Sequence, residues 1–147
     1  LHDAFSPSKC PQLWSEEFLR KLANKLSPGG RFITYSCSAA IRASLRRAGL
    51  VLSSTTPTNT KTNKWSLGTI ATYLTFNDEN IIGSSFSNAL TKMEEEHLLT
   101  SAAIPYRDPT GESSALEILR KRAYEQQQSN LISTSSWKKR WEKAYSS

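Results

Sequence analysis

The chain has 147 residues, a net charge of +6 and 37% hydrophobic residues, which suits one domain with a small core. No apolar run approaches the length of a membrane span and no signal-peptide pattern is visible, so neither a membrane protein nor a secreted one is expected. Cys10 and Cys37 lack the spacing of a metal site. This favours a reducing, cytoplasmic location and predicts no bound metal.

The charge is unevenly distributed along the chain. Residues 1–74 contain 10 Lys and Arg against 3 acids, residues 75–112 contain 2 against 7, and residues 113–147 contain 7 against 3. Two basic segments around an acidic one suit a polyanionic partner, most commonly nucleic acid. A basic protein without such a partner is an equally good interpretation of the charge alone.

The first fourteen residues form a loop that contains two prolines and displays Asp3 and Phe5. Proline restricts the backbone, so this loop is expected to be rigid. Rigid loops that present an acid and an aromatic ring often carry binding or catalytic residues. A helix over residues 15–26 should follow, with Ser15 as its N-cap and apolar residues at helical spacing along one face.

The next elements predict an α/β fold. After a turn at Pro28 to Gly30, residues 31–36 are typical of a strand, residues 39–48 of a helix, and residues 50–53 and 67–74 of two further strands, with a polar loop at 54–66. Alternating strands and helices indicate a parallel sheet. The last two strands, joined by a loop, should pair antiparallel at a sheet edge. Residues 1–75 thus look like the second half of a doubly wound domain.

Residues 76–147 are predicted to form an irregular acidic segment followed by a basic helical extension. Helices are expected at 92–99, at 113–128 with Ser113 or Ser114 as the cap, and at 134–145. The last one has aromatic residues on one side and cations on the other: Trp137, Trp141 and Tyr145, against Lys138, Lys139, Arg140 and Lys143. Such mixtures occur in proteins that bind single-stranded RNA. Docking of the Trp face onto the domain is the favoured alternative.

Several chemistries lack a motif in this sequence. There is no P-loop, no Gly-rich loop after a strand, no nucleophile elbow and no pair of His residues at zinc spacing. Hydrolase and metalloenzyme interpretations therefore have little support.

Three segments resemble one family. The run DAFSPSKCPQLW at residues 3–14 is similar to the D-A-F-[AS]-P-x-K-N-P-x-[ML]-W signature of MnmC-type methyltransferases, although Cys10 stands where the family usually has Asn. LSPGGRFITY at residues 26–35 and IRASLRRAGL at residues 41–50 resemble its L-x-P-G-G-x-[LF]-x-T-[YF] and V-R-x-x-L-x-x-A-G-F segments, in the same order and spacing. The resemblance covers residues 1–54 well and residues 61–74 more loosely.

The resemblance implies the second half of a class I (Rossmann-like) methyltransferase sheet with an α-helical C-terminal extension. It implies S-adenosylmethionine as the methyl donor and, as acceptor, the aminomethyl amine of a tRNA wobble uridine. Bifunctional members of the family also carry a flavin-dependent oxidoreductase domain, which nothing in this chain resembles, so no FAD is expected. The Gly-rich donor loop and the ribose-binding acid of the family should precede Asp3. Residues 1–147 alone are therefore expected to bind the donor weakly and to be inactive.

The resemblance also implies roles for single residues. Asp3 would be the catalytic acceptor and, with Ala4, would line the methyl donor, and Phe5 would line the donor or stack on the base. The residues expected to contact the RNA substrate are Pro7, Lys9, Trp14, Arg42, Arg46, Lys61 and Lys64. Arg42 and Arg46 share one helix face, where like charges cost stability, which hints at an anionic partner. A solvated basic face explains these two arginines equally well.

Two other functions remain open at this point. One is a non-catalytic module that binds RNA or another partner, and the other is a methyltransferase that acts on a different amine.

Overall fold

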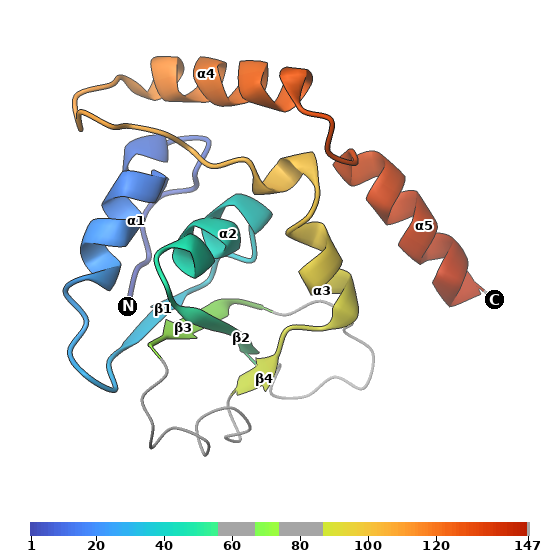
Figure 1. Ribbon diagram of the computed structural model, residues 1–147, viewed down its shortest axis with the longest axis horizontal. Helices are drawn as coiled ribbons and strands as arrows, with labels where there is room; N and C mark the ends of the chain where they lie inside the picture. The colour runs from blue at the N-terminus through green and yellow to red at the C-terminus, as the bar shows by residue number, and fades with distance from the viewer. Residues whose placement is uncertain (56–66, 74–86, 147) are drawn as a thin grey trace.

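The computed structural model describes residues 1–55, 67–73 and 87–146. Figure 1 shows a mixed α/β arrangement in which helices cover one side of a small sheet. The elements, in chain order, are η1 (Pro11–Trp14), α1 (Glu16–Ala23), β1 (Arg31–Thr34), α2 (Ala39–Arg47), β2 (Val51–Thr55), β3 (Thr69–Thr72), β4 (Ser87–Ala89), α3 (Lys92–His97), η2 (Ser101–Ala103), α4 (Ala115–Gln128) and α5 (Thr134–Ser146).

Two of the predicted helices, α1 and α4, begin at their expected N-cap residues. The Ser15 hydroxyl accepts a hydrogen bond from the Phe18 amide at 3.2 Å, so α1 begins at the expected residue. Ser114 caps α4 in a capping box with Glu117. Gly49 ends α2 with a φ of +89°, a backbone conformation that suits glycine. These boundaries follow from local sequence because capping and periodicity involve only neighbouring residues.

The strand order is β1-β3-β2-β4, and every neighbouring pair is antiparallel. The expected antiparallel pairing of β2 with β3 is confirmed. β1 and β2 run in the same direction, as the crossover through α2 predicts, but β3 lies between them and bonds to both. The prediction of a parallel sheet was therefore wrong for the pairing of these four strands, and so was the placement of β3 at a sheet edge. The short strand β4 lies in a segment that was expected to be irregular.

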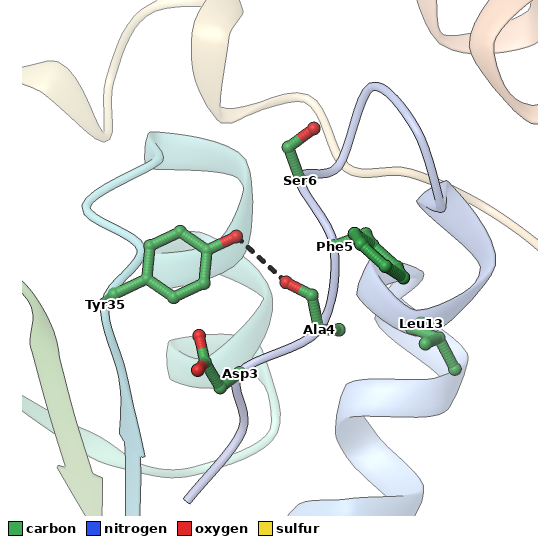
Figure 2. Close-up of a pocket in the computed structure, with 6 residues that line it drawn as sticks. All are labelled: Asp3, Ala4, Phe5, Ser6, Leu13 and Tyr35. Atoms are coloured by element: carbon green, nitrogen blue, oxygen red, sulfur yellow. Dashed lines mark hydrogen bonds between the residues drawn. The ribbon is translucent and has the colours of Figure 1, made fainter.

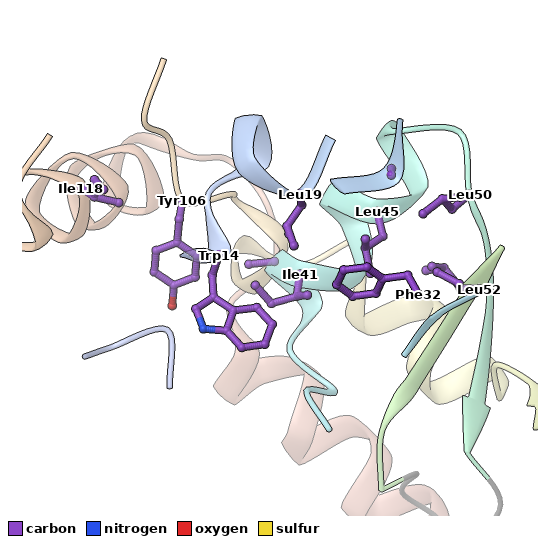
Figure 3. Close-up of a cluster of buried hydrophobic side chains, with 12 residues drawn as sticks. Trp14, Leu19, Phe32, Ile41, Leu45, Leu50, Leu52, Tyr106 and Ile118 are labelled. Carbon is purple, nitrogen blue, oxygen red and sulfur yellow. The ribbon is translucent and has the colours of Figure 1, made fainter. Parts of the chain in front are cut away.

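The core lies between the sheet and the helices α1 and α2 (Figure 3). Phe32, Ala71 and Leu52 face one another across β1, β3 and β2, and all three are buried. Ile41 and Leu45 of α2 belong to the same cluster. Burial of these side chains removes apolar area from water and holds the three strands against α2.

The C-terminal segment packs on the same core. Tyr106 lies beside Ser15, and its carbonyl accepts a hydrogen bond from the Glu16 amide at 2.9 Å. Ile118 of α4 is 1% exposed, and Arg122 lies 4.4 Å above the centre of the Tyr106 ring. Figure 1 shows α4 running across the helices on the side away from the sheet. The predicted boundary near residue 75 falls among the residues that the structure does not describe.

α5 docks through its aromatic face, as the favoured interpretation of its sequence expected. The Trp137 side chain is 3% exposed and stacks on His97 with ring centroids 4.4 Å apart. The Trp141 indole donates to Glu96 Oε2 at 2.9 Å, and Arg140 pairs with the same carboxylate. Over the described part of the chain, no helix has the length and apolar character needed to cross a membrane.

Candidate functional site

An open pocket of about 560 Å³ lies where the first residues of the chain run beside the end of β1 (Figure 2). His2 forms a parallel bridge with Thr34 of β1, and its amide donates to the Ile33 carbonyl at 2.7 Å. The chain then leaves the strand and forms the rim of the pocket. The pocket is lined by Asp3, Ala4, Phe5, Ser6, Leu13 and Tyr35.

Two aromatic side chains hold the backbone of this rim. The Trp14 indole N–H donates to the Phe5 carbonyl at 2.6 Å, and the Tyr35 hydroxyl donates to the Ala4 carbonyl at 3.0 Å. Trp14 is fully buried in the core, so one of the two donors has a fixed position. The rim is therefore attached both to η1 and to the end of β1.

The His2 side chain packs against the same loop. Its ring lies 4.5 Å from the Trp14 ring, edge to face, and its Nε2 lies 3.1 Å from the Leu13 carbonyl. Burial lowers the pKa of His2 from its ordinary value of 6.5, and the hydrogen bond with the Leu13 carbonyl only partly opposes this. His2 is therefore mainly neutral at pH 7 and suits an apolar, structural position.

The side chains of the rim are open to solvent. Phe5 is 76% exposed and Tyr35 is 47% exposed. The Asp3 carboxylate is exposed too, and among the described residues it accepts no hydrogen bond. Figure 2 shows Asp3 on the Tyr35 side of the segment and Phe5 on the Leu13 side. An exposed carboxylate in a pocket that aromatic side chains also line can receive a cationic group or an amine, and the rings can stack on a planar base.

The structure brings some of the expected site residues together. Asp3, Ala4 and Phe5 line one pocket. Pro7 and Lys9 lie in the adjoining turn, in which the Lys9 amide donates to the Ser6 carbonyl at 2.8 Å, and the Lys9 side chain is exposed. Lys61 and Lys64 lie outside the described residues.

Two of the expected RNA contacts are buried, and a third pairs with an acid of the same chain. Trp14 is 0% exposed, so a direct RNA contact through its side chain was a wrong prediction. Arg42 is 0% exposed as well, and its Nη1 lies 2.9 Å from Glu94 Oε1, so it does not reach RNA either. Arg46 makes a bidentate ion pair with Glu95, in which Nη1 lies 2.7 Å from Oε2 and Nη2 lies 2.8 Å from Oε1. Glu94 and Glu95 of α3 are thus anionic partners for these two arginines within the chain, and an RNA contact by the exposed Arg46 stays a prediction.

Sequence reasoning missed Tyr35 and His2 as parts of this site. Tyr35 follows β1 on the exposed face of an alternating strand, which is the signal that could have found it. Its partner, Ala4, is 31 residues away in the sequence, so the contact itself has no local signature. His2 precedes the motif and gives no sequence signal beyond its position.

Neither Cys10 nor Cys37 forms a disulfide in the described part of the chain. In the three described ranges, no group of three or more His, Cys, Asp and Glu side chains could hold a metal ion.

Comparison with known proteins finds a methyltransferase family that part of this chain resembles. A family model described as S-adenosyl-L-methionine-dependent methyltransferase matches residues 1–66. The tRNA 5-methylaminomethyl-2-thiouridine biosynthesis bifunctional protein MnmC of Chromohalobacter salexigens is 38% identical over 47 residues, which are 32% of this chain and 7% of that protein. An uncharacterized protein of Methanocaldococcus jannaschii is 30% identical over 111 residues, 74% of this chain and 28% of that protein.

A solved structure extends the likeness beyond the motif region. MnmC2 from Aquifex aeolicus matches with a TM-score of 0.70 and 27% identity, over 86% of this chain and 37% of that one. The chain therefore has a Rossmann-like methyltransferase fold. Its matched residues are similar to MnmC-type methyltransferase domains, and the chain spans well under half the length of each of these three relatives.

Proposed function

We propose that this chain takes part in methyl transfer from S-adenosylmethionine to the aminomethyl amine of a tRNA wobble uridine. The observation that carries the proposal is the pocket that Asp3 and Phe5 both line, because these residues lie inside the segment that matches the methyltransferase family. The printed name of the Chromohalobacter relative points to tRNA thiouridine modification as the substrate class.

The residues present suit both a cationic donor and an amine acceptor. The donor, when bound, supplies a methyl group attached to a positively charged sulfonium. An exposed carboxylate and an exposed aromatic face favour a cation at this rim. Asp3 accepts a hydrogen bond from the substrate amine, orients the amine lone pair and receives or relays the proton that the amine loses.

The neighbouring side chains hold the substrate. Phe5 offers a ring face on which the uracil base can stack. Lys9 is exposed in the adjoining turn and contacts a phosphate or the uracil edge, while Pro7 keeps this turn in shape. In this proposal Lys61 and Lys64 extend the RNA-binding surface, and the donor-binding half of the site comes from residues other than the described ones.

The proposal is tested by methyl transfer from labelled S-adenosylmethionine to tRNA, using the product of the gene that contains this sequence. Asp3→Asn keeps the size of the side chain and removes its charge. We expect kcat to fall by about 10²-fold, the lower end of what a positioned acid or base contributes, while tRNA affinity stays unchanged. Glu112→Gln, an exposed acid in the loop before α4, is the matched control and should leave kcat unchanged.

The outcomes separate the alternatives. Normal methylation in the Asp3→Asn variant contradicts the role given to Asp3. If the wild-type protein binds tRNA and never methylates it, the chain is a non-catalytic RNA-binding module. If cells that lack the gene keep normal wobble nucleosides by mass spectrometry, the substrate is a different amine.

A further inference from the structure

The backbone that follows Asp3 has an unusual kind of support. The carbonyls of Ala4 and Phe5 accept hydrogen bonds from side chains rather than from a neighbouring strand. Backbone hydrogen bonds lie on either side of residues 3–5: the His2 amide donates to the Ile33 carbonyl, and the Ser6 carbonyl accepts from the Lys9 and Cys10 amides. Residues 3–5 are therefore fixed through the tips of two aromatic side chains.

The two supports differ in what else they do. Trp14 lies in the core, so changing it disturbs the fold as well as the Phe5 carbonyl. The Tyr35 ring is 47% exposed and lies 6.0 Å from the Trp14 ring, edge to face. Its hydroxyl contributes one hydrogen bond, to Ala4, and little packing is lost when only the oxygen is removed.

The position of Asp3 depends on this bond. In the described part of the chain its carboxylate accepts no hydrogen bond, so nothing at the tip of the side chain fixes it. Its direction is set by the backbone, and the Ala4 carbonyl is the next peptide group along the chain. Figure 2 shows the Tyr35 hydroxyl reaching across to that carbonyl from the side on which the Asp3 carboxylate lies.

We propose that Tyr35 is a positioning residue of the methyltransferase site: its hydroxyl, through the Ala4 carbonyl, holds the backbone that aims Asp3. This rests on the role proposed for Asp3. A misdirected carboxylate leaves substrate binding intact and lowers the rate of transfer, because small errors of orientation cost rate. Loss of one such hydrogen bond corresponds to a fall in kcat of about 3- to 10-fold.

The test compares Tyr35→Phe with Tyr124→Phe. Tyr124 is 64% exposed on α4, away from the pocket, and among the described residues its hydroxyl has no hydrogen-bond partner, so the two changes are chemically identical. We expect kcat to fall only in Tyr35→Phe, with the KM for tRNA and the thermal midpoint unchanged in both. An unchanged kcat, a change in KM alone, or an equal fall in kcat for Tyr124→Phe overturns the proposal.

A second measurement does not depend on activity. In the full product of the gene that contains this sequence, NMR relaxation of the Asp3, Ala4 and Phe5 amides should show increased motion in Tyr35→Phe and no increase in Tyr124→Phe. Unchanged order at these amides also refutes the positioning role. If Asp3→Asn methylates normally, the proposed function fails whatever Tyr35 does. If Asp3→Asn is inactive and Tyr35→Phe is fully active, only the role of Tyr35 fails.

Discussion

Removing Arg42 should destabilise the fold far more than removing Arg46, although both lie on α2 and both pair with a glutamate of α3. The Arg42 and Glu94 side chains are each 1% exposed, whereas those of Arg46 and Glu95 are each 45% exposed. Arg42 also donates to Thr69 Oγ1 at 2.8 Å and to the Gly68 carbonyl at 3.2 Å. It therefore links α2, β3 and α3 in the interior.

The expected magnitudes follow from burial. Breaking a buried ion pair by removing one partner costs about 3–5 kcal/mol, because the remaining charge is left unpaired away from water. An exposed pair contributes about 0–1 kcal/mol. Urea unfolding of Arg42→Met should therefore show a loss of about 3–5 kcal/mol, against less than about 1 kcal/mol for Arg46→Met.

The double variant Arg42→Met with Glu94→Gln isolates the cause. The Glu94 carboxylate also accepts from the Thr91 amide at 2.9 Å and so caps α3, a role that the oxygen of a glutamine side chain can keep. Removing the unpaired charge should recover part of the stability lost in Arg42→Met. Equal losses for Arg42→Met and Arg46→Met, or no recovery in the double variant, refute the argument from burial.

Two further predictions concern the helical extension. Burial, with the nearby charges of Arg42 and Lys138, lowers the pKa of His97 from 6.5 to about 4. Because the folded pKa is lower than the unfolded one, this group stabilises the fold fully above pH 6.5 and progressively less as pH falls toward 4. Trp137 fluorescence should report weakened docking of α5 in that window for wild type, and a flatter response for His97→Phe. Ser114→Ala removes the N-cap of α4 and should cost about 1 kcal/mol in urea unfolding, while Ser113→Ala should not.

Local patterns predicted the helices well and the sheet only in part. The caps at Ser15 and Ser114 involve residues three apart, so the sequence contains all the information needed to place them. The position of β3 between β1 and β2 depends on which strand edges remain free after the crossover, and strand periodicity does not encode this. Pairing was therefore predicted correctly for β2 with β3 and missed for β1 with β3.

In the site, too, the sequence predicted what neighbouring residues determine and missed what depends on the fold. Asp3, Ala4 and Phe5 are consecutive, so a motif could place them in one pocket before the fold was known. Tyr35 joins them through a contact between segments 31 residues apart, which only the fold creates. Trp14 belongs to the motif too, yet it holds the Phe5 carbonyl from inside the core. A motif thus groups residues that build a site without saying which of them face the ligand.

The fold changes the interpretation of the acidic and basic segments of the sequence. The acidic segment includes Glu94, Glu95 and Glu96, and each of these pairs with an arginine from another part of the chain. The sequence left open whether the two arginines of α2 face an anionic partner or solvent, and α3 supplies a carboxylate for each of them. Charge counts therefore overstate the cationic surface that is available to RNA. Of the cations that the sequence analysis assigned to RNA, Lys9 is the one in the described ranges that is exposed and makes no salt bridge, and it adjoins the pocket that contains Asp3.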